Sequence, residues 1–430
     1  MKISTCKRII SVFVLLILTF NFINIVAWQK NVLGSNKVVP TYSFAIDWNN
    51  LYPFQDQAAP KAANSTASPA QTGFLTKWRN KAKAISKAEN SLEKNSIYQM
   101  LAFHPLVELN SFVTTKFGKV IFPNEDVFQL KNGYWTFKND RISEAATEQT
   151  ADNIASLNQY CLKEGSHFLY VQTPYKICEQ DPEIPDGAEN YGNQNYDSIL
   201  AALKKREVPS FDLRAQIRAE NLNHYSMFYV TDHHWKVESA FWASGEIVRK
   251  LNTLFDSKLD VSNTGKSLYL TKTYPDWFLG SIGRRVSLGC AKPEDFSILL
   301  PTFKTSLNIQ VPNAEINKTG SFADVIYNKK ALETKDYYNA SCYESQLYGN
   351  QPLTQIRNEK NPNGPKILVL GDSFSLALVP YLSLTANETD LIDFRRDQGN
   401  FSGSIQAYIN QTKPDVVLLA YEPDASYSLK

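Results

Sequence analysis

Two short stretches of the sequence carry side chains that could together perform acyl transfer. The first is Thr231-Asp232-His233-His234-Trp235, and the second is Gly371-Asp372-Ser373-Phe374. An Asp carboxylate can orient an imidazole and stabilise its charged form, and the imidazole can then deprotonate a serine hydroxyl. The residue types therefore predict a serine nucleophile with an Asp–His pair as its base.

Ser373 follows the apolar run 366–370 and precedes a second apolar run with helical spacing. Gly371 allows a sharp turn between the predicted strand and the predicted helix, which would place Ser373 at the helix N-terminus. The backbone N–H of Ser373 could there stabilise a developing oxyanion, and we expect Asp372 to brace the turn. Serine is also a common N-cap, so the sequence leaves this second interpretation of Ser373 open.

Three interpretations of Asp232, His233 and His234 remain open on residue types alone. A catalytic pair needs the carboxylate near one ring nitrogen and the other nitrogen free for the serine. A metal site needs further ligands with recognisable spacing, which the other histidines do not supply, so we predict no metal. In the third interpretation, Asp232 caps the next helix and the two rings lie at the surface.

The elements that must position these residues alternate between helices and strands. Sequence periodicity predicts helices over 142–163, 194–206, 237–251, 374–384 and 402–412. It predicts strands over 167–173, 209–213, 366–370, 390–394 and 415–421. This alternation is typical of an α/β fold with a mostly parallel sheet and helices on both faces. Ligands bind at the carboxyl ends of such strands, and both motifs follow predicted strands.

Residues 256–365 break this rhythm, and we interpret them as an irregular, β-containing insertion. The stretches with the composition of strands are 296–300, 307–311 and 323–327. Among the cysteines after the N-terminus, Cys161 and Cys178 flank a predicted strand about 20 Å long, too far for a disulfide. If a disulfide forms, we expect it between Cys290 and Cys342, with free buried thiols as the alternative.

The N-terminus predicts a membrane anchor. Lys2, Lys7 and Arg8 precede the apolar run Ile9–Ala27, which is about long enough to span a bilayer. Because Ile25-Val26-Ala27 is a poor cleavage site, we predict an uncleaved signal anchor in the cell membrane, with the N-terminus cytoplasmic and the rest extracytoplasmic. A cleaved signal peptide and a buried helix are the alternatives.

Composition sets the remaining limits on organisation and partners. We assign residues 1–30 to the anchor, the region 31–95 to a linker with a small, polar stalk at its centre, and 96–430 to one globular domain. A net charge of +2 over 430 residues gives no strong field, which argues against a nucleic-acid partner.

Thr231–Trp235 resembles the signature of the DHHW family, and it is similar to the Thr-Asp-x-His-Trp motif of the alginate O-acetylation proteins, which are SGNH-hydrolase-like. Gly371–Phe374 resembles the nucleophile block of the same proteins, in the same order along the chain. Weaker similarities lie at Val-Gln-Thr-Pro-Tyr-Lys (171–176), Phe-Leu-Gly-Ser (278–281), Tyr-Gly-Asn (348–350) and Ile-Asp-Phe-Arg (392–395). The resemblance covers roughly residues 95–430.

The resemblance implies a role for each matching residue. Ser373 would be the nucleophile, His234 the base, and Asp232 the acid that orients His234. His233 occupies a position that varies in the family, so we expect it to pack or to contact substrate.

The usual Gly and Asn oxyanion blocks of SGNH hydrolases are not plainly present. Asn350, in a loop before the nucleophile strand, is the candidate for oxyanion stabilisation, with an ordinary Gly-Asn turn as the alternative. Arg395 would bind substrate or pair with a carboxylate.

The function that the resemblance implies is O-acetylation of a cell-surface or exported polysaccharide through an acyl-serine, with no cofactor. A multi-spanning membrane acyltransferase would supply the acetyl donor. The same three residues with water as acceptor would make a carbohydrate esterase or deacetylase. A protein that binds or assembles polysaccharide without catalysis is the third possibility, and intact Asp232, His234 and Ser373 argue against it.

The anchor can be tested directly. If the apolar segment is retained, mass spectrometry of the native protein should find a peptide that contains residues before Ala27. A mature N-terminus at Trp28 or beyond would instead show that the segment is removed and the enzyme released.

Overall fold

The computed structural model describes residues 126–393 and 404–420, together with short pieces between residues 108 and 122. The predicted anchor (1–30), the linker (31–95) and Arg395 lie outside the described residues. The chain divides into two compact units, Met1–Leu109 and Asn110–Lys430, and the account below concerns the second. In the described part of the chain, none of the helices combines the length and the apolar character needed to cross a membrane.

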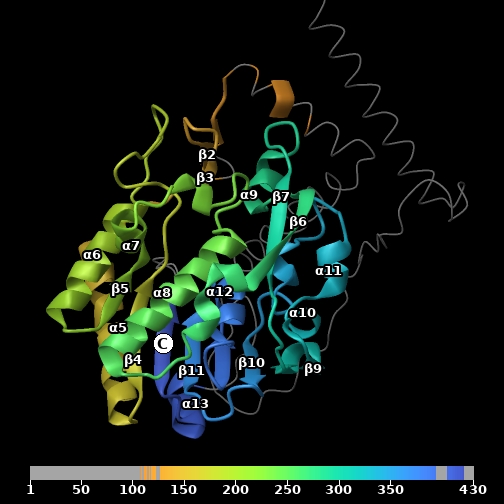
Figure 1. Ribbon diagram of the computed structural model, residues 1–430. Coiled ribbons are helices and arrows are strands. Elements are labelled where there is room, and N and C mark those ends of the chain that lie inside the picture. Colours follow the sequence, from red (N-terminus) through yellow and green to blue (C-terminus); the bar gives the residue numbers. More distant parts are fainter. Residues whose placement is uncertain are drawn as a thin grey trace, which may run out of the picture. The chain divides into compact units, whose positions relative to one another are not determined.

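An eight-stranded sheet with the order β5-β4-β13-β11-β12-β10-β8-β9 organises the second unit (Figure 1). Its strands are β4 (His167–Gln172), β5 (Ser210–Asp212), β8 (Leu307–Val311), β9 (Ile316–Gly320), β10 (Leu353–Asn358), β11 (Lys366–Gly371), β12 (Glu388–Ile392) and β13 (Val416–Ala420). The strands from β5 to β12 in this order pair in parallel, whereas β10, β8 and β9 continue the sheet in antiparallel pairs.

Helices cover both faces of the parallel strands. They are α5 (Glu144–Lys163), α6 (Gly192–Lys205), α7 (Leu213–Ala219), α8 (Val237–Phe255), α12 (Ser375–Leu382) and α13 (Ile405–Thr412). Because side chains alternate along a strand, Leu368 and Leu370 of β11 pack in one cluster with α5, α6 and α13, whereas Ile367 and Val369 join the core with α7, α8 and α12. The predicted α/β fold class is therefore confirmed.

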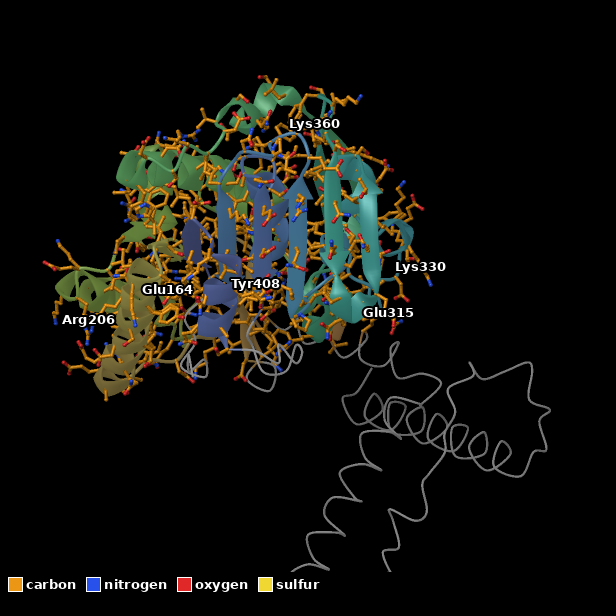
Figure 2. All side chains as sticks on the ribbon, turned by 90° about the horizontal axis from the view of Figure 1, so that it is seen from below. Glu164, Arg206, Glu315, Lys330, Lys360 and Tyr408 are labelled. Carbon is orange, nitrogen blue, oxygen red and sulfur yellow. The ribbon has the colours of Figure 1, made fainter. Side chains whose placement is uncertain are left out.

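On the first of these faces, Glu164 at the end of α5 and Tyr408 of α13 lie on neighbouring helices (Figure 2). Lys413, which follows α13, forms an ion pair with Glu164 at 2.7 Å, and the hydroxyl of Tyr160 on α5 donates to the carbonyl of Gln406 at 3.1 Å. These contacts hold α13, near the end of the described chain, against α5, the first long helix.

The region 256–365, which we expected to be an irregular, β-containing insertion, contributes β8, β9 and β10 to the main sheet. The stretch 296–300 lies in β7 (Glu294–Pro301), which pairs with β6 (Tyr269–Phe278), a strand that the sequence analysis did not predict. Residues 323–327 form no strand. A short helix, α10 (Phe322–Val325), stands there because Phe322 and Val325 are three residues apart and bury the same side of a helical turn.

Smaller elements complete the described part. They are β1 (Ile121–Phe122), β2 (Val127–Gln129) and β3 (Trp135–Phe137) in an antiparallel sheet, the short helices α9 (Ser281–Val286) and α11 (Lys329–Glu333), and single 3₁₀ turns at Tyr225–Met227, Ser262–Thr264, Lys266–Leu268, Pro312–Ala314 and Tyr343–Ser345.

None of the four cysteines in the described part forms a disulfide, so the Cys290–Cys342 pairing is not made. The two residues belong to different parts of the core. Cys342 is buried in the main core, whereas Cys290 packs against a separate cluster and its thiol donates to the carbonyl of Ser111 at 3.3 Å.

The end of β11 gives a test of this packing. A methyl group at Gly371 would overlap the hydroxyl of Ser375 and lie 3.2 Å from the carbonyl oxygen of Ala420. Gly371→Ala should therefore lower the free energy of unfolding by about 1–3 kcal/mol, the usual cost of overpacking. Urea denaturation of the full chain measures this loss in the free energy of unfolding.

Gly265 is the matched control, because its backbone has an ordinary φ of −81° and a methyl group there would meet nothing closer than 3.9 Å. Equal losses for Gly371→Ala and Gly265→Ala would contradict the packing at the end of β11.

Candidate active site

Asp232 lies on a tight turn that is closed by a single antiparallel bridge between Phe228 and Trp235 and leads into α8. The sequence analysis expected a strand before this motif, but the chain makes only this bridge before it turns back. Lys236 occupies the N-cap position of α8, with no side-chain capping bond. Asp232 is thus not the cap of that helix, which removes the third interpretation of the motif.

Asp232, His234 and Ser373 form one chain of hydrogen bonds. The Nδ1 atom of His234 lies 2.5 Å from Oδ1 of Asp232, and its Nε2 atom lies 2.7 Å from Oγ of Ser373. A carboxylate can only accept, so we assign the ring proton to Nδ1 and leave Nε2 as the acceptor for the serine hydroxyl. In this arrangement His234 is oriented to remove the Ser373 proton.

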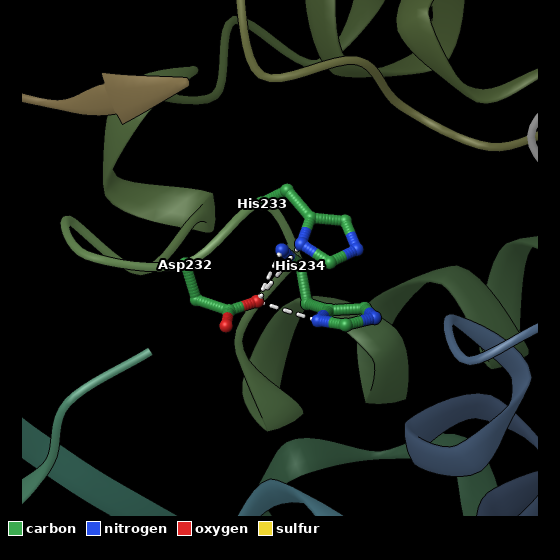
Figure 3. A group of neighbouring side chains, drawn as sticks. All are labelled: Asp232, His233 and His234. Atoms are coloured by element: carbon green, nitrogen blue, oxygen red, sulfur yellow. Dashed lines mark hydrogen bonds and ion pairs between the residues drawn. The ribbon is translucent and has the colours of Figure 1, made fainter. Parts of the chain in front are cut away.

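His233 lies beside this chain of hydrogen bonds (Figure 3). Its ring stands 3.8 Å from that of His234, centroid to centroid, and its Nδ1 atom is 3.1 Å from Oγ of Ser281. Its side chain is 26% exposed, compared with 9% for His234. His233 is therefore the more accessible of the two rings and does not bridge Asp232 and Ser373.

The ligand atoms of Asp232, His233 and His234 lie within 4.8 Å of one another, so their types and spacing could suit a metal ion. Both nitrogens of His234 are used by Asp232 and Ser373, and Oδ2 of Asp232 accepts from the backbone N–H of Ser281 at 2.5 Å. A metal held by all three residues would have to replace these hydrogen bonds. The geometry therefore favours proton transfer.

Ser373 stands on a turn between β11 and α12. Asp372 braces this turn, since its Oδ1 accepts from the N–H of Phe374 at 2.9 Å. Phe374, not Ser373, occupies the N-cap position of α12. None of the described residues accepts a hydrogen bond from the Ser373 N–H, which leaves it available to an oxyanion.

Two further side chains hold the turns together. The indole N–H of Trp235 donates to the carbonyl of Phe374 at 3.1 Å. Tyr343 stacks on the ring of His234 with centroids 4.3 Å apart, and its hydroxyl donates to the carbonyl of Ser373 at 3.1 Å. The sequence analysis missed Tyr343, because a lone tyrosine in an irregular region carries no pattern.

Asn350 lies in the loop that precedes β10. The first residue of β10, Leu353, pairs with Ile392 at the carboxyl end of β12, and Ile392 pairs with Leu370. This loop is therefore at the same edge of the sheet as Ser373. The oxyanion role of Asn350 stays a prediction, as does the substrate role of Arg395.

The segment after β6 fits closely around Asp232. Gly280 has no room for a side chain, because a Cβ atom there would overlap Asp232 and the carbonyl of Thr231. Its N–H donates to the hydroxyl of Thr231 at 2.9 Å, and the next N–H, of Ser281, reaches Asp232. The weak Phe-Leu-Gly-Ser similarity at 278–281 was the signal for this contact.

Burial of Asp232 opposes its charge, but the two imidazoles and the N–H of Ser281 outweigh that effect and hold the pKa of the carboxyl well below its usual range. Asp232 thus stays ionised and can stabilise a positive charge on His234.

Comparisons with known proteins match part of this chain and its fold. Residues 132–296, which include Asp232 and His234, match the family model of the SGNH hydrolase-like domain of the acetyltransferase AlgX. The fold is thus SGNH hydrolase-like. The resemblance to the DHHW family and to the alginate O-acetylation proteins is confirmed at this level, while Ser373 lies outside the matched residues.

Solved structures share the fold of this SGNH hydrolase-like domain. Bacillus cereus PatB1 with a sulfonyl adduct has a TM-score of 0.57 and 20% identity, covering 70% of this chain and 97% of that one. A DHHW family protein from Eubacterium siraeum has a TM-score of 0.50 and 17% identity, covering 69% and 89%. No curated protein matches the sequence.

The depressed pKa of Asp232 predicts how its contribution to stability depends on pH. The ionised carboxylate stabilises the folded state at pH values above about 4, the ordinary pKa of Asp, and this contribution is lost as the pH falls toward the folded pKa. The difference in free energy of unfolding between wild type and Asp232→Asn should therefore shrink below about pH 4. Urea titrations at several pH values measure it, and a difference that grows on acidification would contradict the assignment.

Proposed function

We propose that this protein is an extracytoplasmic O-acetyltransferase that acts on a cell-surface or exported polysaccharide. The hydrogen-bonded chain Asp232–His234–Ser373 supports this proposal most directly. Part of the chain also matches the family model of an acetyltransferase domain. Acyl transfer uses a serine nucleophile with an imidazole base in this arrangement.

In the first half of the reaction, Oγ of Ser373 attacks the carbonyl carbon of an acetyl ester while Nε2 of His234 takes the hydroxyl proton. The ionised Asp232 stabilises the imidazolium that results. The tetrahedral intermediate then expels the oxygen of the donor, which receives the proton from His234. The products are acetyl-Ser373 and the deacetylated donor.

In the second half, a sugar hydroxyl takes the place of the donor oxygen. His234 removes the proton of that hydroxyl as it attacks the acetyl carbonyl, and the intermediate collapses to release Ser373, which regains its proton. The N–H of Ser373 is one donor to the oxyanion in both halves, and Asn350 is the second candidate.

The partners and the location follow from the proposed chemistry and the predicted anchor. An enzyme held on the outer side of the membrane needs an acetyl donor that is made inside, so a multi-spanning membrane acyltransferase is the partner that we propose. His233 and Arg395 are the residues that we propose to contact the acceptor.

Labelling with an activated acetyl ester tests the proposal. The protein should accumulate one acetyl group on Ser373, found by mass spectrometry of its peptides. Ser373→Ala and His234→Ala should each lower the labelling rate by about 10⁶-fold, as when a nucleophile or base is removed from such a unit. Asp232→Asn should lower it by about 10⁴-fold, because the tautomer of His234 is no longer fixed.

Ser375→Ala is the matched control. Ser375 lies two residues from the proposed nucleophile, but its hydroxyl donates to the carbonyl of Ala420 at 3.2 Å, so its loss should leave labelling unchanged. Faster transfer from acetyl-Ser373 to an added oligosaccharide than to water supports the transferase. Transfer to water with every glycan would make the protein an esterase, and wild-type protein that binds glycan but never labels would make it a binding protein.

A further inference from the structure

A buried lysine contacts the turn that carries Asp232. Lys176 is only 2% exposed, and its ammonium group donates to the carbonyl of Trp135, to that of Val230 at 3.1 Å and to that of Asp232 at 2.7 Å. The three N–H donors of a protonated lysine thus match three carbonyl acceptors. Nothing in the proposed reaction uses this ammonium group.

A carboxylate contacts the same turn from another side and accepts hydrogen bonds from the backbone N–H groups of the turn. Glu294, at the start of β7, accepts from the N–H of Val230 and the N–H of Thr231, both at 2.7 Å. It also accepts from the hydroxyl of Thr231 at 2.6 Å. Lys176 therefore binds the carbonyl groups of Val230 and Asp232, while Glu294 binds the N–H groups of Val230 and Thr231.

The charges of Lys176 and Glu294 make both side chains strong hydrogen-bond partners for the backbone of this turn. A turn outside the sheet has no strand partners for its N–H and C=O groups, and buried groups of this kind must find others. Hydrogen bonds from a charged donor or to a charged acceptor are shorter and stronger than neutral ones. Burial lowers the pKa of Lys176 to about 7, while the negative charges of Glu294 and Asp232 favour its protonated form.

We propose that Lys176 and Glu294 are positioning residues, which hold the backbone of residues 230–232 from two sides and so keep the Asp232 carboxylate against His234. Neither residue would touch substrate. The kinetic consequence rests on the proposed function, whereas the structural consequence does not.

The structural consequence can be measured without any reaction. The proton between His234 Nδ1 and Asp232 should give a far-downfield NMR resonance, which Asp232→Asn should abolish. Lys176→Met keeps the length of the side chain and removes its three hydrogen bonds, and Glu294→Gln keeps shape but not charge. Each variant should shift or broaden this resonance if the turn loses its position.

The kinetic consequence uses acetyl labelling of Ser373. Lys176→Met should lower the maximal rate of labelling by about 10²-fold, the scale expected for a misplacement near 1 Å, and leave the half-saturating concentration of the acetyl ester unchanged. The double variant should lose less than the product of the two single losses, because both residues hold one segment.

Arg214→Met is the matched control. Arg214 is equally buried and ionic, with partners Asp197 and Asp212, but it does not contact the Asp232 turn. The Arg214→Met variant should have a lower free energy of unfolding than wild type. Its resonance for the proton between His234 and Asp232, and its labelling rate per folded molecule, should equal those of wild type.

The outcomes separate the two proposals. Wild-type protein that never labels, but whose resonance is lost in Lys176→Met and Glu294→Gln, would overturn the proposed function and keep the positioning role. If Lys176→Met does not fold, Glu294→Gln decides alone. A folded Glu294→Gln protein with wild-type resonance and labelling rate would overturn the positioning role, as would equal effects in Arg214→Met.

Discussion

The hydrogen bond between His234 and Ser373 joins two turns that are 139 residues apart in the chain, and the rest of the site depends on it. One of these turns is fixed by the sheet. Ser373 follows β11, which lies between β13 and β12 in the parallel part of the sheet and is buried from Ile367 to Gly371. Ser373 therefore follows a buried strand that is paired on both sides.

The other turn has no such support, because only one bridge closes it. Its backbone groups are satisfied instead by side chains and loops from several elements, which include the N-terminal sheet, the segment after β4 and the β6–β7 hairpin. Trp235 then joins it to the turn that carries Ser373. Displacing any one of these elements would move Asp232 and His234 together. The position of both side chains therefore depends on the contacts made by residues 230–232.

The sequence predicted the parts of this arrangement that have a local pattern. Apolar runs such as 366–370 and helical spacing after Val237 gave the βα units, and the two motifs gave the residues that the structure brings together. The contacts of Lys176, Glu294 and Tyr343 arise only from tertiary packing, so spacing could not show them. The antiparallel extension was missed because the pairing of β8 with β10 is set by their neighbours and not by their own composition. The short helix at Phe322–Val325 was mistaken for a strand because a few apolar residues fit either period.

The charges around the turn also bear on the chemistry. Asp232 and Glu294 place two carboxylates close to one ammonium group, that of Lys176, which leaves the resting site with an excess of negative charge. In the proposed reaction, the imidazolium that forms when His234 takes the Ser373 proton lies close to this excess, while an equal negative charge develops on the oxyanion. A buried environment strengthens such interactions, because few water molecules screen them. Lys176 limits the excess in the resting state, because its charge favours the ionised form of Glu294 and interacts with Asp232. Lys176 and Glu294 thus hold the turn in place and also contribute to the electrostatic potential at His234, where the proposed reaction places the Ser373 proton.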